Sequence, residues 1–157
     1  MRVSGKKVAM GLTIFTQDGD LEYRFEKGGY CLENGAITIS VQCEAVEDDG
    51  FPPVALFCLE NHLLLEAPQV GDVYSHIGGM SVNKESRPHR AWAYFSFHAD
   101  QVTQTWTVEA VEGDALTFLL VASHEDVNYY DERAKTTETK GHFRLLPVRR
   151  EELWIPS

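Results

Sequence analysis

The stretch Ala36-Ile-Thr-Ile-Ser-Val-Gln-Cys-Glu44 alternates apolar with mostly polar side chains along its length. In an extended chain, successive side chains point to opposite faces. One face of this stretch is therefore apolar, and it carries Ile37, Ile39, Val41 and Cys43. The stretch Leu21-Glu-Tyr-Arg-Phe-Glu-Lys27 has the same period of two. This period indicates half-buried β-strands, and no long stretch of the chain sustains a helical period.

The same pattern extends over the 157 residues, and Gly-, Asp-, Asn- and Pro-containing turn signals separate the runs. We expect one all-β domain over residues 1–157, an antiparallel sandwich or flattened barrel of about ten strands. The expected strands lie near residues 7–16, 21–27, 36–46, 54–60, 62–67, 72–77, 91–98, 103–111, 115–124 and 136–146. Residues 28–31, with two glycines, are expected to form a turn.

Register can be predicted in the second half of the chain. A four-residue loop, Ala99–Val102, would pair strand 91–98 with strand 103–111. A two-residue turn at Gly113-Asp114 would pair strand 103–111 with strand 115–124, and it places Trp106 opposite Val121. Strand 115–124 is apolar on both faces and is expected to be covered on both sides. The residues expected to be buried are Leu119, Val121, Trp106, Phe95, Ile37 and Ile39.

This register gathers a mixed aromatic and polar face on strands 91–98 and 103–111. Its candidate ligand-binding residues are Trp92, Tyr94, Thr105, Thr107 and Glu109. Aromatic rings would stack on a flat organic ligand, and the hydroxyl groups and the carboxylate would orient it. The alternative is an ordinary outer sheet face, on which aromatic residues pack across from threonines.

A metal site is a second possibility at the edge of that face. The register places His124 opposite Thr103 and at the level of His98, which separates the two histidines by about 10 Å between Cα atoms. Asp126 follows directly and could complete a set of histidine and carboxylate ligands for zinc or manganese. The candidate ligands are therefore His98, His124 and Asp126. The alternative is an acidic loop that only interacts with water.

Sequence signatures of catalysis are absent. The chain has no Gly-x-Ser-x-Gly elbow and no phosphate-binding Gly-x-x-x-x-Gly-Lys loop. The three cysteines, Cys31, Cys43 and Cys58, make no Cys-x-x-Cys pair and are expected to be small buried hydrophobic residues in a reducing compartment. Cys31, in the expected turn, is the one cysteine that could act as a nucleophile. We therefore expect a protein that is not an enzyme, and no cofactor is indicated.

The charge of the chain is −10, and residues 18–50 alone hold nine acidic and two basic residues. Such a field repels nucleic acid and anionic lipid surfaces. No run of about 18 apolar residues would span a membrane, and no clear signal-peptide cleavage site follows residues 1–15. The sequence therefore predicts a cytoplasmic binding protein, in an adaptor or neutralising role, whose partner is a protein with a basic surface. The alternative function is the small-molecule or metal-dependent site described above.

Overall fold

The computed structural model describes residues 10–16, 19–47, 53–77, 90–94, 98–99, 101–125 and 136–155. Ten strands and one short 3-10 helix lie in this part of the chain. The strands are β1 (Gly11–Thr16), β2 (Gly19–Glu33), β3 (Ala36–Ala45), β4 (Val54–Leu63), β5 (Val73–Ile77), β6 (Arg90–Tyr94), β7 (His98–Ala99), β8 (Gln101–Glu112), β9 (Ala115–Glu125) and β10 (Thr136–Leu145). The helix, η2, spans Arg150–Glu152.

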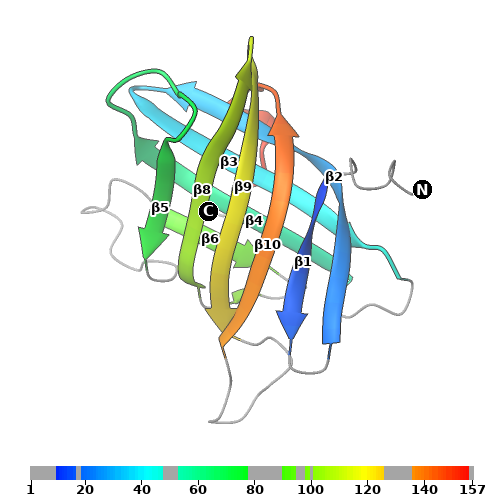
Figure 1. Ribbon diagram of the computed structural model, residues 1–157. Helices are drawn as coiled ribbons and strands as arrows, with labels where there is room; N and C mark the ends of the chain where they lie inside the picture. The colour runs from blue at the N-terminus through cyan, green and yellow to red at the C-terminus, as the bar shows by residue number, and fades with distance from the viewer. Residues whose placement is uncertain are drawn as a thin grey trace.

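The ten strands form one antiparallel sheet in the order β5-β8-β9-β10-β1-β2-β3-β4-β6-β7. The sheet curls into a nearly closed barrel, in which β8, β9 and β10 cross in front of β3, β4 and β6 (Figure 1). This confirms the predicted all-β antiparallel fold and selects the barrel over the sandwich. Strand β1 lies between β10 and β2. The first described strand therefore joins the part of the wall made by β8, β9 and β10 to the part made by β2, β3 and β4.

Most of the predicted strands are confirmed, and two local predictions are wrong. Residues 28–31 are part of β2 and do not form a turn. This strand has a bulge between Phe25 and Lys27 and two glycines directly after it, and bulges and glycines let a long strand bend around a barrel. The predicted separate strand at 62–67 is also wrong, because β4 continues through Asn61, which has a positive φ of 59°, to Leu63.

The predicted pairing of strand 91–98 with strand 103–111 is wrong. Strand β6 pairs with β4 on one side and with β7 on the other, while β8 pairs with β5 and β9. The chain therefore leaves β6 through a short β7 and enters β8 elsewhere in the sheet. A strand with many apolar residues can find its partner far away in the sequence, and a loop length alone does not reveal this.

The hairpin of β8 and β9 is confirmed, but its register changes along its length. Glu112 lies opposite Ala115 as expected, and a bulge between Val108 and Ala110 then shifts the pairing by one residue. Trp106 consequently lies opposite Leu120 and not Val121, and both side chains point into the barrel.

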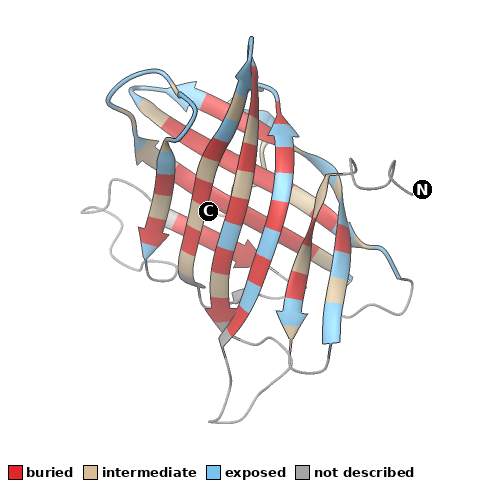
Figure 2. Ribbon diagram, viewed as in Figure 1, coloured by how far each residue is buried: buried red, intermediate tan, exposed pale blue. Residues whose placement is uncertain are grey.

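The barrel interior is filled by large side chains. Buried and exposed positions alternate along β9 and β10 (Figure 2). Trp106, Ile37 and Ile39 are fully buried, as predicted. Leu119 and Val121 were expected to be buried too, and this is wrong, because β9 is covered on its inner face only and Val121 is 38% exposed. Phe95 lies outside the described residues.

All three cysteines are free and buried, as predicted. Cys43 points into the barrel, and burial raises the pKa of its thiol to about 12. Burial and the nearby charge of Glu33 also raise the pKa of Cys31. An activated cysteine nucleophile needs a lowered pKa, so this environment does not favour catalysis at Cys31.

Candidate functional site

The five predicted ligand-binding residues fall into two groups on different parts of the sheet. Trp92 and Tyr94 lie on β6, opposite Cys58 and Leu56 of β4. Trp92 is only 5% exposed, and its indole Nε1 donates to Glu60 Oε1 at 3.4 Å. These residues are not part of the interior core, so they belong to the outer side of the sheet.

Thr105, Thr107 and Glu109 form the second group, on the outer face of β8. The two threonines are half-buried, and Glu109 is exposed with its Oε1 at 3.5 Å from His142 Nε2. Because β6 and β8 are not backbone neighbours, the register that joined the two groups into one site is wrong. The two pockets described below are lined by none of the five residues.

Of the predicted metal ligands, the structure describes the side chain of His124 only. His124 points into the barrel, its Nε2 lies 2.9 Å from Thr139 Oγ1, and its ring centroid lies 6.1 Å from that of Phe57. It pairs with Gln101 and not with Thr103. The His98 side chain and Asp126 lie outside the described residues, so the metal site stays a prediction. Within the described ranges, no group of three or more His, Cys, Asp or Glu residues could hold a metal ion.

A buried glutamine that connects β8 to β6 was not among the predicted site residues. Gln104 of β8 is fully buried, its Nε2 donates to the Trp92 carbonyl oxygen at 3.2 Å, and its Oε1 accepts from Trp106 Nε1 at 2.8 Å. These bonds link β8 to β6, where no backbone ladder joins them. The signal was present, because the alternation of strand 103–111 already places Gln104 on the apolar side with Trp106.

A second missed feature is the C-terminal strap, residues 146–155, which follows β10 and crosses the outer side of β2, β3 and β4. Tyr30 of β2 donates its backbone N–H to the Leu146 carbonyl and accepts from the Val148 N–H. Ser40 of β3 donates its hydroxyl to the Trp154 carbonyl at 2.8 Å, and the ring of Trp154 lies 6.4 Å from that of Tyr94.

The strap neutralises a buried carboxylate. Glu60 is 4% exposed, and its Oε2 lies 2.6 Å from Arg150 NH2. Arg150 NH1 also donates to Thr38 Oγ1 and Asn61 Oδ1, at 3.3 and 3.2 Å. Trp92 and Tyr94 thus lie on the outer side of β6, near the chain's own C-terminal segment, and not on one face with Thr105 and Thr107.

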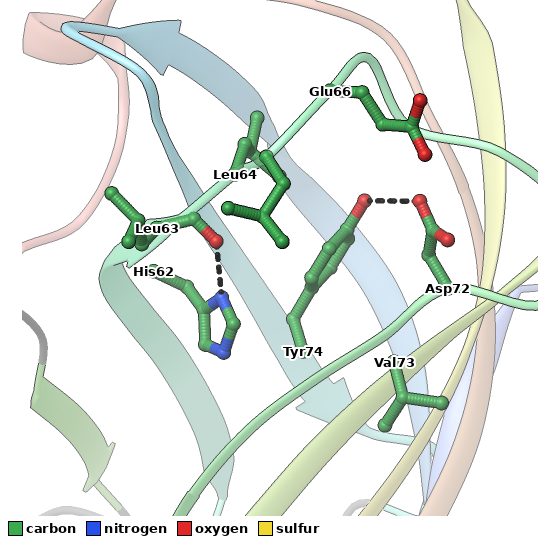
Figure 3. Close-up of a pocket in the computed structure, with 8 residues that line it drawn as sticks. His62, Leu63, Leu64, Glu66, Asp72, Val73 and Tyr74 are labelled. Atoms are coloured by element: carbon green, nitrogen blue, oxygen red, sulfur yellow. Dashed lines mark hydrogen bonds between the residues drawn. The ribbon is translucent and has the colours of Figure 1, made fainter.

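A pocket of about 230 Å³ opens between the β4–β5 loop and β5 (Figure 3). Its polar end holds Glu66, Asp72 and the hydroxyl group of Tyr74, and its other end holds Leu63, Leu64 and the ring of His62. Asp72 Oδ2 accepts from Tyr74 OH at 3.2 Å and from the Gln69 backbone N–H at 2.9 Å. Burial, and then the charge of Asp72, raise the pKa of Tyr74, so its hydroxyl stays protonated and donates.

A second, larger groove of about 490 Å³ lies over β10, β1 and β2. Charges of both signs line it, from Glu22, Arg24 and Lys140. A groove lined by both acidic and basic side chains does not favour a ligand of one charge sign. The β4–β5 pocket is therefore the sharper candidate site.

Comparison of the chain with protein-family models, with curated proteins and with solved structures gives no match. In the described part of the chain, no helix is long and apolar enough to cross a membrane.

Proposed function

We propose that the protein is a non-enzymatic binding module that contacts a basic surface of another protein. The observation that carries the proposal is the distribution of exposed charge from β2 to β5. Among the described residues of 19–47 and 53–77, seven acidic side chains are exposed, and two basic side chains, Arg24 and Lys27, are exposed with them. The exposed acidic residues are Asp20, Glu22, Glu26, Glu33, Glu44, Glu47 and Glu66.

The interior and covered polar groups support a binding role over a catalytic one. Glu60 is paired with Arg150, Gln104 bonds to Trp92 and Trp106, and His124 bonds to Thr139. Each of these contacts holds strands or the strap together. A predominantly acidic surface raises the rate of encounter with a basic partner and disfavours acidic partners.

The test begins with the immobilised protein and native lysate, at low and at high salt. Proteins retained at low salt and released at high salt are identified, and one is then purified and its association rate measured. We expect the variant with Asp20→Asn, Glu22→Gln, Glu44→Gln and Glu47→Gln to associate roughly tenfold more slowly than the wild type.

The matched control removes the same number of charges from elsewhere on the barrel. All four control positions are exposed, and the substitutions are Glu109→Gln, Glu112→Gln, Glu138→Gln and Glu151→Gln. We expect this control to associate at nearly the wild-type rate. Equal rates for the two quadruple variants, or no protein retained at low salt, would contradict the proposed function.

A further inference from the structure

We propose that the β4–β5 pocket receives a lysine or arginine side chain of the partner protein, with apolar partner residues packing on the rim around it. This inference rests on the proposed function and assigns the place and the chemistry of the contact. The pocket residues it uses are His62, Leu64, Glu66, Asp72 and Tyr74.

The polar end of the pocket is suited to a cation. Glu66 is exposed and Asp72 is half-buried, and Figure 3 shows both carboxylates at the same end as the Tyr74 hydroxyl group. Both hydrogen bonds that the Asp72 carboxylate accepts from the described residues end on Oδ2, which leaves Oδ1 available to a ligand. No lysine or arginine is among the described residues that line the pocket.

The chain supplies no basic side chain of its own near this segment in sequence. From Gly28 through Asn83 there is no lysine or arginine, while eight acidic residues occur. Glu60, in the same stretch, obtains its cation from the strap through Arg150. For Glu66 and Asp72, a cation from another molecule would complete the same kind of pair, and a hydrogen bond to a charged group contributes more than a neutral one.

The apolar end is suited to the carbon chain of a lysine or arginine. Such side chains place their methylene groups along apolar surface while the charged head reaches polar groups. Leu64 and the rings of His62 and Tyr74, with centroids 5.3 Å apart, provide this surface. A volume of about 230 Å³ lies below the range of about 300–1,000 Å³ typical of sites for drug-sized ligands, so it suits one side chain better.

The rim indicates a macromolecular partner. Five of the eleven exposed large apolar residues found in the described ranges lie between residues 63 and 77. They are Leu63, Leu65, Val70, Val73 and Ile77, and Leu65 and Ile77 are 95% and 81% exposed. Leu63, Leu65 and Val73 also line the pocket, and exposed apolar residues around a polar pocket are typical of a protein-binding surface. The carboxylates disfavour an anionic lipid surface, which is the other surface an apolar loop can enter.

The experiment uses the full chain and two synthetic pentapeptides with blocked termini. The first peptide is Gly-Leu-Lys-Leu-Gly, and the second has norleucine in place of lysine. Amide NMR shifts measure the affinity and locate the contact. We expect the lysine peptide to bind at least about fivefold more tightly and to shift residues 62–74. Equal affinities, or shifts located elsewhere, would overturn the inference.

Two variants test the carboxylates. Glu66→Gln changes an exposed side chain and is expected to leave the fold intact, and the double variant Glu66→Gln, Asp72→Asn removes both charges. We expect each to reduce the preference for the lysine peptide, and the double variant to abolish it. The control Glu22→Gln, Glu44→Gln should keep the preference. A double variant that keeps it while its NMR spectrum remains folded would also overturn the inference.

Two further arms separate this inference from the proposed function and from lipid binding. If the identified partner associates with the double variant as with the wild type, the pocket assignment fails while the proposed function stands. If no partner is retained but the lysine peptide binds as expected, the proposed function fails and the pocket chemistry stands. Binding to phosphatidylcholine vesicles, lost in Leu65→Ser, would replace the protein partner with a membrane and overturn the inference.

Discussion

The barrel has two outer surfaces that look alike in sequence and differ in structure. On β3, β4 and β6, polar and aromatic side chains such as Glu60, Trp92 and Tyr94 lie beneath the C-terminal strap. On β8 and β9, Thr105, Thr107 and Val121 lie on an outer face that is partly exposed. Both surfaces come from strands with alternating side chains, but only one contains a buried charge.

The difference shows what the strap does for the fold. A carboxylate in a covered layer is destabilising unless a cation and hydrogen bonds accompany it. Arg150 provides both the cation and further bonds to Thr38 and Asn61. The hydroxyl groups of Thr105 and Thr107 on β8 do not require a partner from the strap, because water can reach them. We therefore expect substitutions in the strap to lower the free energy of unfolding more than substitutions on the outer face of β8.

The largest effect is expected for Arg150→Ala. It leaves the buried carboxylate of Glu60 without its cation, and we expect the free energy of unfolding to fall by about 3 kcal/mol. Urea denaturation measures this value. The control is Arg144→Ala, because Arg144 and Glu112 form an ion pair with both side chains more than half exposed. The control should cost less than about 1 kcal/mol. Equal losses for the two variants would contradict the role of the strap.

Gly29→Ala should have the next largest effect. A Cβ atom at Gly29 would lie 2.8 Å from the Leu146 carbonyl oxygen and about 3 Å from the Val148 methyl groups, so the strap would have to move. We expect a loss of about 2 kcal/mol in urea denaturation. Because Arg150→Ala disturbs the same strap, the two substitutions together should cost less than the sum of the two. Strict additivity would show that Gly29 acts independently of the strap.

Trp154→Ala should loosen the end of the strap and cost about 1 kcal/mol. Thiol labelling offers a sharper measurement, since Cys31 and Cys58 are buried outside the core cluster while Cys43 is inside it. We expect faster labelling of Cys31 and Cys58 in this variant, with Cys43 as the internal control. Equal acceleration at all three cysteines would indicate loosening of the whole barrel.

The smallest effect is expected on the other outer surface. Thr107→Ala on β8 removes a half-buried hydroxyl group from a face that water can reach. We expect a change in the free energy of unfolding within about 0.5 kcal/mol. A loss above about 1 kcal/mol would show that this surface is also covered or bonded in a way that matters for stability.

Much of the wall could be predicted from the sequence, because a period of two is a local property. Strand 36–46 and strand 115–124 correspond closely to β3 and β9. The register of β8 against β9 could not be predicted. The bulge between Val108 and Ala110 adds one residue to β8, and no residue in this stretch marks its position in the sequence. One inserted residue moves all later pairs and turns Val121 outward.

The candidate site could not be predicted from the sequence, because its residues come together through long-range contacts. Trp92 and Tyr94 were grouped with Thr105 and Thr107 through a strand pairing that is wrong, and Arg150 and Trp154 have no periodic pattern that would place them beside Trp92 and Tyr94. Contacts between residues 90 positions apart, as for Glu60 and Arg150, leave no local signal. The β4–β5 pocket was missed because Leu63, Leu64 and Leu65 resemble a strand more than a pocket wall.

The position of β1 between β2 and β10 has a consequence for the order in which a newly made chain can fold. Strands β1 to β4 can pair with their neighbours as soon as they leave the ribosome, but β1 keeps an open edge until β10 is made. The partner of Glu60, Arg150 of the strap, arrives later still. A nascent barrel therefore has both an open strand edge and an uncompensated buried carboxylate until β10 and Arg150 have left the ribosome. Such edges favour pairing between chains, so we expect ribosome-bound fragments that end before β10 to aggregate more readily than the finished protein.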